Sequence, residues 1–185
     1  LWAWGRNEYG ELGDGTAIDR STPVQSAITG VTQVATGWYH SLAVRSDRSV
    51  WAWGVNSNGE LGDGTLSNKL TPSPVPNFTG AIAVAAGQYH SLALKSDGTV
   101  WAWGWNGNGR LGDGSGTQRI SPVQVVGLTN AIAIAAGQSY SVALRSDGAK
   151  NEAADLVRDA WRNHTFGAGF EANILKLFAG MLTEV

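Results

Sequence analysis

A block of sequence occurs three times in this chain at spacings of 49 and 50 residues, and this repetition constrains the fold more than any other feature. The tetrapeptide Trp-Ala-Trp-Gly begins at residues 2, 51 and 101. Each copy continues with Leu-Gly-Asp-Gly, a Pro-Val pair, an alternating apolar segment and a Ser-Asp pair. A chain with such a period forms one supersecondary unit several times and buries its core between neighbouring units.

Each copy has the pattern of short β-strands. Segments of four to six residues alternate in polarity, and Gly or Asp-Gly separates them. Asp97-Gly98, between two such segments, is typical of a tight hairpin. The first copy has Asp47-Arg48 at this position, and because arginine rarely adopts a positive φ, we expect a different turn type there. Several short strands in a period near 50 predict the blades of a β-propeller.

The repeated residues resemble the repeat of the RCC1 (regulator of chromosome condensation) family of propellers. The shared residues are Trp-Ala-Trp-Gly, Leu-Gly-Asp-Gly, Pro-Val, Ala-Ala-Gly with His-Ser-Leu-Ala-Leu, and Ser-Asp-Gly. The resemblance covers residues 1–148, as three repeats of about 1–49, 50–99 and 100–148. It implies a mainly β fold, namely a partial RCC1-type propeller of three blades, whereas the closed form of the family has seven four-stranded blades.

The tryptophan pairs are the largest side chains that the copies share. Each Trp-Ala-Trp places two indoles on the same face of a strand, and we expect them to pack between blades, with Trp53 and Trp103 largely buried. The alternative is a light-sensing tryptophan cluster, as in a plant photoreceptor that has this repeat. Trp38 lies in a Gly-Trp-Tyr-His-Ser segment that resembles a motif of that receptor, but the other copies have Gln88 and Gln138 at its position.

Residues 149–185 leave the repeat and have the composition of helices. Apolar residues recur at helical spacing in two stretches, which a Gly-rich segment at residues 165–169 separates. We expect an amphipathic helical hairpin on the open flank of the third blade, where it either caps the arc or joins two copies. The candidate residues of this tail interface are Trp161, Phe170, Ile174, Leu177, Phe178 and Met181.

Composition argues against several classes of function. The chain has no cysteine, which excludes disulfides and thiolate chemistry. The 13 basic and 15 acidic residues give a net charge of −2, so we expect no nucleic-acid partner. No run of 18 apolar residues occurs, so we expect no membrane span. Because the chain begins at Leu1, within the motif, we expect a processed chain or a segment of a longer protein.

Histidine–serine pairs in the first two copies raise the question of hydrolase chemistry. They are His40-Ser41 and His90-Ser91, and the third copy has Tyr140-Ser141. A catalytic triad needs one asymmetric arrangement with an oriented base, whereas these residues recur from copy to copy. We therefore expect strand-borne histidines that hydrogen-bond the backbone, no catalytic residues, and a protein that is not an enzyme.

The repeated Asp of Leu-Gly-Asp-Gly raises the question of a metal site. Asp14, Asp63 and Asp113 each stand alone between two glycines. A Ca²⁺ site needs several clustered acidic residues, whereas a single Asp beside Gly is typical of a turn. We therefore expect neither a metal ion nor a cofactor.

Residues that differ between the copies are the candidates for binding, because loops on a rigid scaffold carry recognition. The candidate protein-binding residues are Arg6, Tyr9, Trp38, Val55, Trp105 and Arg119. They predict a non-enzymatic scaffold that binds a protein partner through its variable loops, and that self-associates or forms part of a longer propeller.

The resemblance leaves a second function open. The eukaryotic protein that names the family is a guanine nucleotide exchange factor for a small GTPase, and this activity is the alternative. Its exchange wedge is an insertion in one blade, and the three copies here are nearly equal in length and have no such insertion.

Overall fold

The computed structural model describes residues 1–146, and this part of the chain forms β-strands joined by turns and loops, with no helix. The strands are β1 (Trp2–Gly5), β2 (Arg20–Gln25), β3 (Val31–Thr36), β4 (His40–Arg45), β5 (Val50–Gly54), β6 (Lys69–Pro74), β7 (Ala81–Ala86), β8 (His90–Lys95), β9 (Val100–Gly104), β10 (Arg119–Gln124), β11 (Ala131–Ala136) and β12 (Ser141–Arg145). Within residues 1–146, no helix could cross a membrane. The predicted helical hairpin and its interface residues lie outside the described residues.

The strands form antiparallel sheets whose limits do not coincide with the sequence repeats. Strands β3-β4-β5-β6 make the first complete blade and β7-β8-β9-β10 the second. Strands β1-β2 and β11-β12 make two-stranded sheets, here called the N-terminal and C-terminal half blades. The expectation of three whole blades is therefore wrong, because the Ser-Asp turn joins the last strand of one repeat to the first strand of the next as a hairpin.

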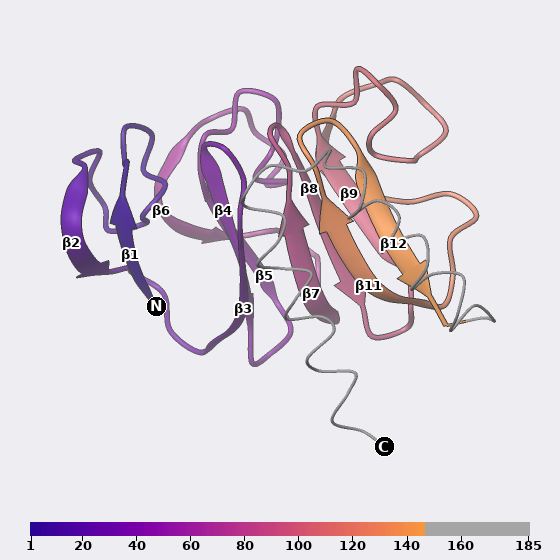
Figure 1. Cartoon of the computed structure of the whole chain (residues 1–185), viewed down its shortest axis with the longest axis horizontal. Coiled ribbons are helices and arrows are strands. Elements are labelled where there is room, and N and C mark those ends of the chain that lie inside the picture. The colour runs from indigo at the N-terminus through magenta and orange to yellow at the C-terminus, as the bar shows by residue number, and fades with distance from the viewer. Residues whose placement is uncertain (147–185) are drawn as a thin grey trace, which may run out of the picture.

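The blades stand side by side along an arc (Figure 1). The first strand of each blade lies on the inner side, where β3 contacts β7 and β7 contacts β11. Strands β2, β6 and β10 lie at the opposite, outer edge of their sheets. This arrangement of four-stranded meanders around an axis is the architecture of a propeller.

Apolar side chains of the middle strands fill the space between the blades. Strands β4 and β8 are buried along most of their length. Trp53 and Trp103 are only 2% and 0% exposed, which confirms the prediction that they pack between blades. Trp2 and Trp4 on β1 are 62% and 64% exposed, because no blade precedes β1 in the described part of the chain.

The hairpin between β4 and β5 corrects the expected turn type. Arg48 adopts a φ of 63°, close to the 77° of Gly98 at the equivalent position, so the two turns have the same conformation. The backbone N–H of Arg48 donates to the carbonyl of Arg45, and the Asp47 carboxylate accepts from the backbone N–H of Ser49 at 3.0 Å. These hydrogen bonds hold Arg48 in a left-handed conformation that costs a non-glycine residue about 1–3 kcal/mol.

Candidate protein-binding edge

Two sets of loops lie on the same edge of the molecule, here called the loop edge. In a sheet whose four strands run alternately up and down in chain order, the first and third connecting loops lie at one end of the sheet, and the second loop lies at the other end. The loop edge therefore combines the long loops after β1, β5 and β9 with the short loops after β3, β7 and β11. Figure 1 shows the long loops along the upper side of the arc.

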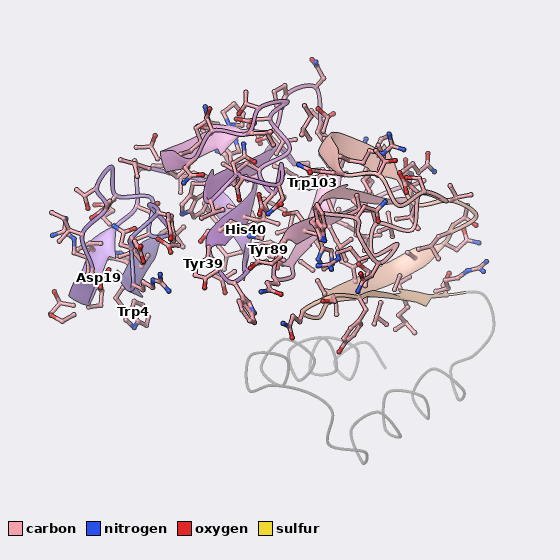
Figure 2. The ribbon with its side chains drawn as sticks, turned by 90° about the horizontal axis from the view of Figure 1, so that it is seen from above. Trp4, Asp19, Tyr39, His40, Tyr89 and Trp103 are labelled. Carbon is pink, nitrogen blue, oxygen red and sulfur yellow. The ribbon has the colours of Figure 1, made fainter. Side chains whose placement is uncertain are left out.

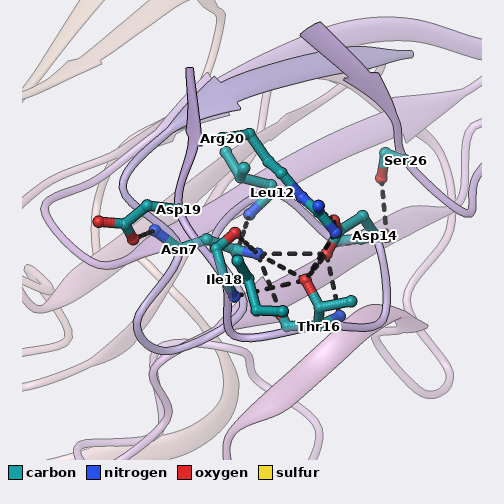
Figure 3. A network of polar contacts seen from close by, with 9 residues as sticks. Asn7, Leu12, Asp14, Thr16, Ile18, Asp19, Arg20 and Ser26 are labelled. Atoms are coloured by element: carbon teal, nitrogen blue, oxygen red, sulfur yellow. Dashed lines mark hydrogen bonds and ion pairs between the residues drawn. The ribbon is translucent and has the colours of Figure 1, made fainter. Parts of the chain in front are cut away.

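Each long loop folds around one buried asparagine. Asn7, Asn56 and Asn106 are all 0% exposed. The Asn7 Nδ2 atom donates to the Asp14 carboxylate at 3.1 Å and to the Thr16 carbonyl at 3.0 Å (Figure 3). Its Oδ1 atom accepts from the Leu12 backbone N–H at 2.9 Å. Asn56 and Asn106 make the same bonds in the next two loops, so all three loops have one rigid shape.

The Asp of each Leu-Gly-Asp-Gly segment braces the same loop. Burial by itself raises the pKa of Asp14, but hydrogen bonds from Thr16, Arg20 and Asn7 outweigh it and lower that pKa to about 2. The ion pairs are Arg20–Asp14 at 2.8 Å, Lys69–Asp63 at 3.5 Å and Arg119–Asp113 at 2.7 Å. Each Asp is therefore a structural anion that holds its loop against the start of the following strand.

A second repeated contact joins neighbouring blades. The indole Nε1 of Trp53 and the hydroxyl of Ser41 both donate to the Glu11 carbonyl, at 2.7 and 2.8 Å. Trp103 and Ser91 donate in the same way to the Glu60 carbonyl, both at 2.7 Å. We call this arrangement the carbonyl latch, and it locks each blade to the loop of the blade before it.

The histidines extend the latch to the serine hydroxyls of the next blade. The His40 Nε2 atom lies 2.9 Å from the Ser91 hydroxyl, and His90 Nε2 lies 3.1 Å from the Ser141 hydroxyl. Because each serine donates its proton to a carbonyl, the histidine must donate to the serine. The expectation of a bond to the backbone is therefore wrong for His40, whereas His90 has a backbone hydrogen bond with Tyr140 beside its contact with the hydroxyl of the next blade.

Both histidines are neutral over the physiological range of pH. Burial, and to a smaller extent the charge of His90, lowers the pKa of His40 to about 3. Burial and the Arg110 guanidinium lower the pKa of His90 to about 4. A protonated imidazolium is thus disfavoured at both positions.

This burial predicts that the fold loses stability as the pH falls below about 6. Histidine in the unfolded chain has a pKa near 6.5, so below it the unfolded state binds more protons than the folded state. The free energy of unfolding then falls by up to about 1.4 kcal/mol per pH unit for each histidine. Urea unfolding between pH 6.5 and 4.5 should show that the free energy of unfolding of His90→Gln falls less steeply with decreasing pH than that of the unaltered chain. An equally steep fall would contradict this assignment. Asp14 and Asp113, with pKa values of about 2, weaken the fold only below about pH 4.

A cluster of aromatic and arginine side chains, in which Arg6 and Trp38 are exposed and Tyr9 and Tyr39 are half-buried, lies on the loop edge between the N-terminal half blade and the first blade. The Arg6 guanidinium lies 5.0 Å from the ring centroid of Tyr39 and 5.8 Å from that of Tyr9. The Tyr9 and Tyr39 rings meet edge to face at 5.7 Å, and Trp38 meets Tyr39 at 6.2 Å. Arg6 also pairs with Glu8. Figure 2 shows Tyr39 from above, and we call these five residues the aromatic–arginine cluster.

The structure brings together three of the six residues predicted for protein binding. Arg6, Tyr9 and Trp38 belong to the cluster, and Trp38 is 53% exposed. Trp105 is 41% exposed on the loop after β9, in the second blade. Sequence reasoning missed Tyr39 and Glu8, although Tyr39 directly follows Trp38.

Two of the predicted binding residues have structural roles. Val55 is only 9% exposed, and its backbone N–H donates to the Tyr39 carbonyl, so its side chain is not available to a partner. Arg119 is occupied by its ion pair with Asp113. Variation between copies did not reveal this burial, because Arg6 and Trp105 occupy the same position of their repeats and are exposed.

Neither a metal site nor a tryptophan cluster is present on the described loop edge. Within residues 1–146, no three His, Asp or Glu side chains gather closely enough to hold a metal ion. Gln88 and Gln138 replace Trp38 in the later copies, and their side-chain amides bond each other at 3.1 Å. Trp38 therefore contacts tyrosine and not another indole.

Comparison with known proteins gives a family match over most of the chain. The family model described as the regulator of chromosome condensation (RCC1) repeat matches residues 1–44, 47–94 and 97–144. Over 53 residues, 27% of this chain, the sequence is 40% identical to the ultraviolet-B receptor UVR8 of Arabidopsis thaliana, and the match covers 12% of that protein.

Solved structures share the fold. The structure of Kap60 bound to yeast RCC1 (Prp20) matches with a TM-score of 0.69 and 24% identity, over 80% of this chain and 38% of that one. Human WBSCR16 matches with a TM-score of 0.68 and 24% identity, over 80% of this chain and 40% of that one. Prp20p of Saccharomyces cerevisiae, described with its binding properties to Gsp1p and histones, matches with a TM-score of 0.68 and 23% identity, over 86% of this chain and 43% of that one. This chain spans less than half the length of these relatives.

Proposed function

The chain belongs to the RCC1-repeat family, and from this premise we propose that it is a non-enzymatic scaffold that binds a protein partner through its loop edge. The observation that carries the proposal is the aromatic–arginine cluster. Tryptophan, tyrosine and arginine are the residues that most often dominate the energy of protein interfaces. Here they gather from two neighbouring blades on loops at one edge.

The cluster is held ready for a partner before binding. Arg6 is fixed between two tyrosine rings, and the loop that carries it is held by the buried Asn7. Side chains that are already ordered lose little conformational entropy when they bind, so more of the contact energy contributes to affinity. The half-exposed indole of Trp38 supplies apolar area next to the charged pair of Arg6 and Glu8.

The absence of enzymatic activity is part of the proposal. The hydroxyls of Ser91 and Ser141 are used in the contacts between blades, and both histidines are held neutral. A serine nucleophile needs a base that can take its proton, whereas these histidines donate to the serines. These contacts support structural roles for the histidine–serine pairs.

Binding to two probe proteins tests the proposal. The probes are Gsp1p and histones, because the structure of yeast Prp20p is described together with its binding to both. We expect the full chain to bind one of them, and Arg6→Ala to weaken that binding about tenfold, the loss of about 1.4 kcal/mol. Arg48→Ala on the opposite edge removes the same charge and should leave affinity unchanged. Binding of neither probe, or an equal effect of both substitutions, would contradict a role of the loop edge.

Nucleotide exchange is the alternative function, and the same purified chain can be assayed for it. A small GTPase loaded with fluorescent guanine nucleotide is mixed with the full chain, and release of the nucleotide is followed. A scaffold leaves the release rate unchanged, whereas an exchange factor raises it. Accelerated release that Arg6→Ala abolishes would replace the scaffold proposal with exchange at the same edge.

A further inference from the structure

Three asparagine–glycine pairs occur in the chain, and all three lie in the long loops of the loop edge. Asparagine is a thermolabile residue, and a glycine after it has no Cβ to keep its backbone nitrogen away from the side-chain amide. What holds each asparagine side chain therefore decides how long its amide lasts. The pairs are Asn58-Gly59 in the loop after β5, and Asn106-Gly107 and Asn108-Gly109 in the loop after β9.

The side chain of Asn106 is locked on all sides. It is 0% exposed, because it is the buried asparagine around which the loop after β9 folds. Its Nδ2 atom donates to the Asp113 carboxylate and to the Ser115 carbonyl, both at 3.0 Å. Its Oδ1 atom accepts from the Leu111 backbone N–H, also at 3.0 Å. The amide cannot turn towards Gly107 without breaking these bonds, so we expect it to last as long as the fold does.

The side chain of Asn58 is held by a buried carboxylate. Glu60 is only 1% exposed, and its Oε1 atom accepts from the Asn58 Nδ2 atom at 2.8 Å. The other carboxylate oxygen accepts from the Asn58 backbone N–H at 2.8 Å. Hydrogen bonds to an ionised group are about twice as strong as those between neutral groups. Glu60 therefore holds both the main chain and the side-chain amide of Asn58.

Asn108 occupies the place of Asn58 in the next repeat, but it has no such partner. Arg110 stands at the position of Glu60, and a guanidinium cannot accept a hydrogen bond. The Arg110 side chain instead donates to the Gln138 carbonyl at 3.4 Å. Asn108 is exposed, and among residues 1–146 its side chain has no hydrogen-bond partner.

We propose that Asn108 is a site of spontaneous deamidation, at which a neutral amide of the loop edge becomes a carboxylate. The Gly109 backbone nitrogen attacks the Asn108 Cγ atom and loses its proton. The bond between Cγ and Nδ2 breaks, and the nitrogen leaves with that proton as ammonia, so that a five-membered succinimide remains. Water then adds to one of the two ring carbonyls and breaks its C–N bond, which gives aspartate or isoaspartate. Water is the only co-reactant, and nothing is oxidised or reduced.

The main chain makes the same turn at both pairs, so it does not favour one of them. The Gly109 N–H donates to the Asn106 carbonyl, and the Gly59 N–H donates to the Asn56 carbonyl, both at 3.0 Å. This bond must open before the glycine nitrogen can attack, and we expect it to slow the reaction equally in the two loops.

The difference in rate comes from the carboxylate. Asn58 must release its Nδ2 atom from Glu60 before its Cγ atom can be attacked, whereas Asn108 has no such bond to break. The lost charge-assisted bond adds to the barrier at Asn58 alone. We therefore expect Asn108 to react about tenfold faster than Asn58, or more.

The product changes the chemistry of the loop edge. It adds one negative charge to the loop that carries the exposed Trp105. The isoaspartate form also adds one CH2 group to the main chain beside the buried Asn106. Newly made and aged copies of the protein therefore differ in charge and in main-chain length at this loop. The inference does not rest on the proposed function, because the reaction is detected in the chain alone.

Peptide mass spectrometry of the full natural chain tests the proposal without any substitution. The folded chain is kept in mildly alkaline buffer, and samples are digested at intervals. Exchange of NH2 for OH raises the mass of a peptide, and fragmentation locates the change. We expect conversion at Asn108 about tenfold faster than at Asn58, or more, and none at Asn106. Equal rates at Asn58 and Asn108, or faster conversion at Asn58, would overturn the proposal.

The same chain unfolded in guanidinium chloride is the reference. Unfolding removes the bonds that distinguish the three pairs, so all of them should be converted at similar rates. If Asn108 remained intact in the folded chain for as long as it takes to be converted in the unfolded chain, the proposal would also be overturned.

Two reciprocal substitutions test the role of the carboxylate. Arg110→Glu supplies Asn108 with the acceptor that Asn58 has, and should slow its conversion about tenfold. Glu60→Ala removes the acceptor from Asn58 and should speed its conversion by a similar factor. Each variant keeps the backbone carbonyl that completes the latch, and circular dichroism shows whether it folds. Unchanged rates in both folded variants would overturn the proposal, and if a variant does not fold, the comparison within the natural chain decides.

Discussion

Replacing Trp103 with alanine should lower the free energy of unfolding by about 3–5 kcal/mol. Trp103 is 0% exposed, its ring centroid lies 5.9 Å from that of Phe78, and its Nε1 atom donates to the Glu60 carbonyl at 2.7 Å. The substitution leaves a cavity between the two complete blades and removes half of the carbonyl latch. Urea unfolding, followed by far-ultraviolet circular dichroism, measures the loss.

Trp105→Ala is the matched control for this experiment. The residue lies two positions further along the chain, but it is 41% exposed on the loop edge. Surface substitutions usually change stability by about 0.5 kcal/mol or less, so we expect a small effect. A comparable loss for Trp105→Ala and Trp103→Ala would contradict the assignment of Trp103 to the contact between blades.

Replacing Asn56 with alanine should cost about 3 kcal/mol of stability. The Asn56 amide is completely buried and donates to the Asp63 carboxylate and to the Thr65 and Ser67 carbonyls, while its Oδ1 atom accepts from the Leu61 N–H. Alanine leaves several of these groups without a partner, and each buried unsatisfied group costs about 1–3 kcal/mol. Thermal and urea unfolding measure the change.

Asn58→Ala makes the same chemical change two residues away. The Asn58 side chain is partly exposed, and its Nδ2 atom donates to the buried Glu60 carboxylate and to the Ser57 hydroxyl. Because the backbone N–H of Asn58 also donates to that carboxylate, Glu60 keeps a partner, and we expect this variant to lose about 1.5 kcal/mol, half of the loss for Asn56→Ala. If Asn58→Ala destabilised the fold as much as Asn56→Ala, the buried amide could not be what holds the loop.

The repeat predicted the type of fold but not how the blades divide the sequence. Trp-Ala-Trp-Gly opens each repeat, yet in each complete blade it forms the third strand. A periodic sequence looks the same wherever its period is taken to begin, so only the hydrogen bonds between strands show the limits of a blade. The tight Ser-Asp turn was the available signal, because a hairpin keeps the strands that it joins in one sheet.

The candidate site could be predicted in part. Variation between copies identified Arg6, Tyr9 and Trp38, which the structure brings together. It missed Tyr39 because the second copy also has a tyrosine there, Tyr89, so the position varies less. Variation also pointed to Val55, whose side chain is buried although Arg6 and Trp105 at the equivalent position are exposed.

The contacts between blades could not be derived from the sequence alone. The carbonyl latch uses the backbone oxygens of Glu11 and Glu60, and a backbone group leaves no trace in the residue type. The third copy has Arg110 at the same position, yet its carbonyl accepts the same bond from Ser141. Histidine–serine pairs were visible in the sequence, but each histidine bonds a serine in the next blade, 51 residues further along the chain.

Hydrogen–deuterium exchange tests most directly the claim that this protein acts through its loop edge. The full chain is compared alone and saturated with the probe that it binds, Gsp1p or histones. We expect binding to slow exchange in peptides covering residues 6–9 and 37–39, which carry the aromatic–arginine cluster, and to leave the turn at residues 46–49 on the opposite edge unchanged. Protection at that opposite turn, with none at the cluster, would contradict binding through the loop edge.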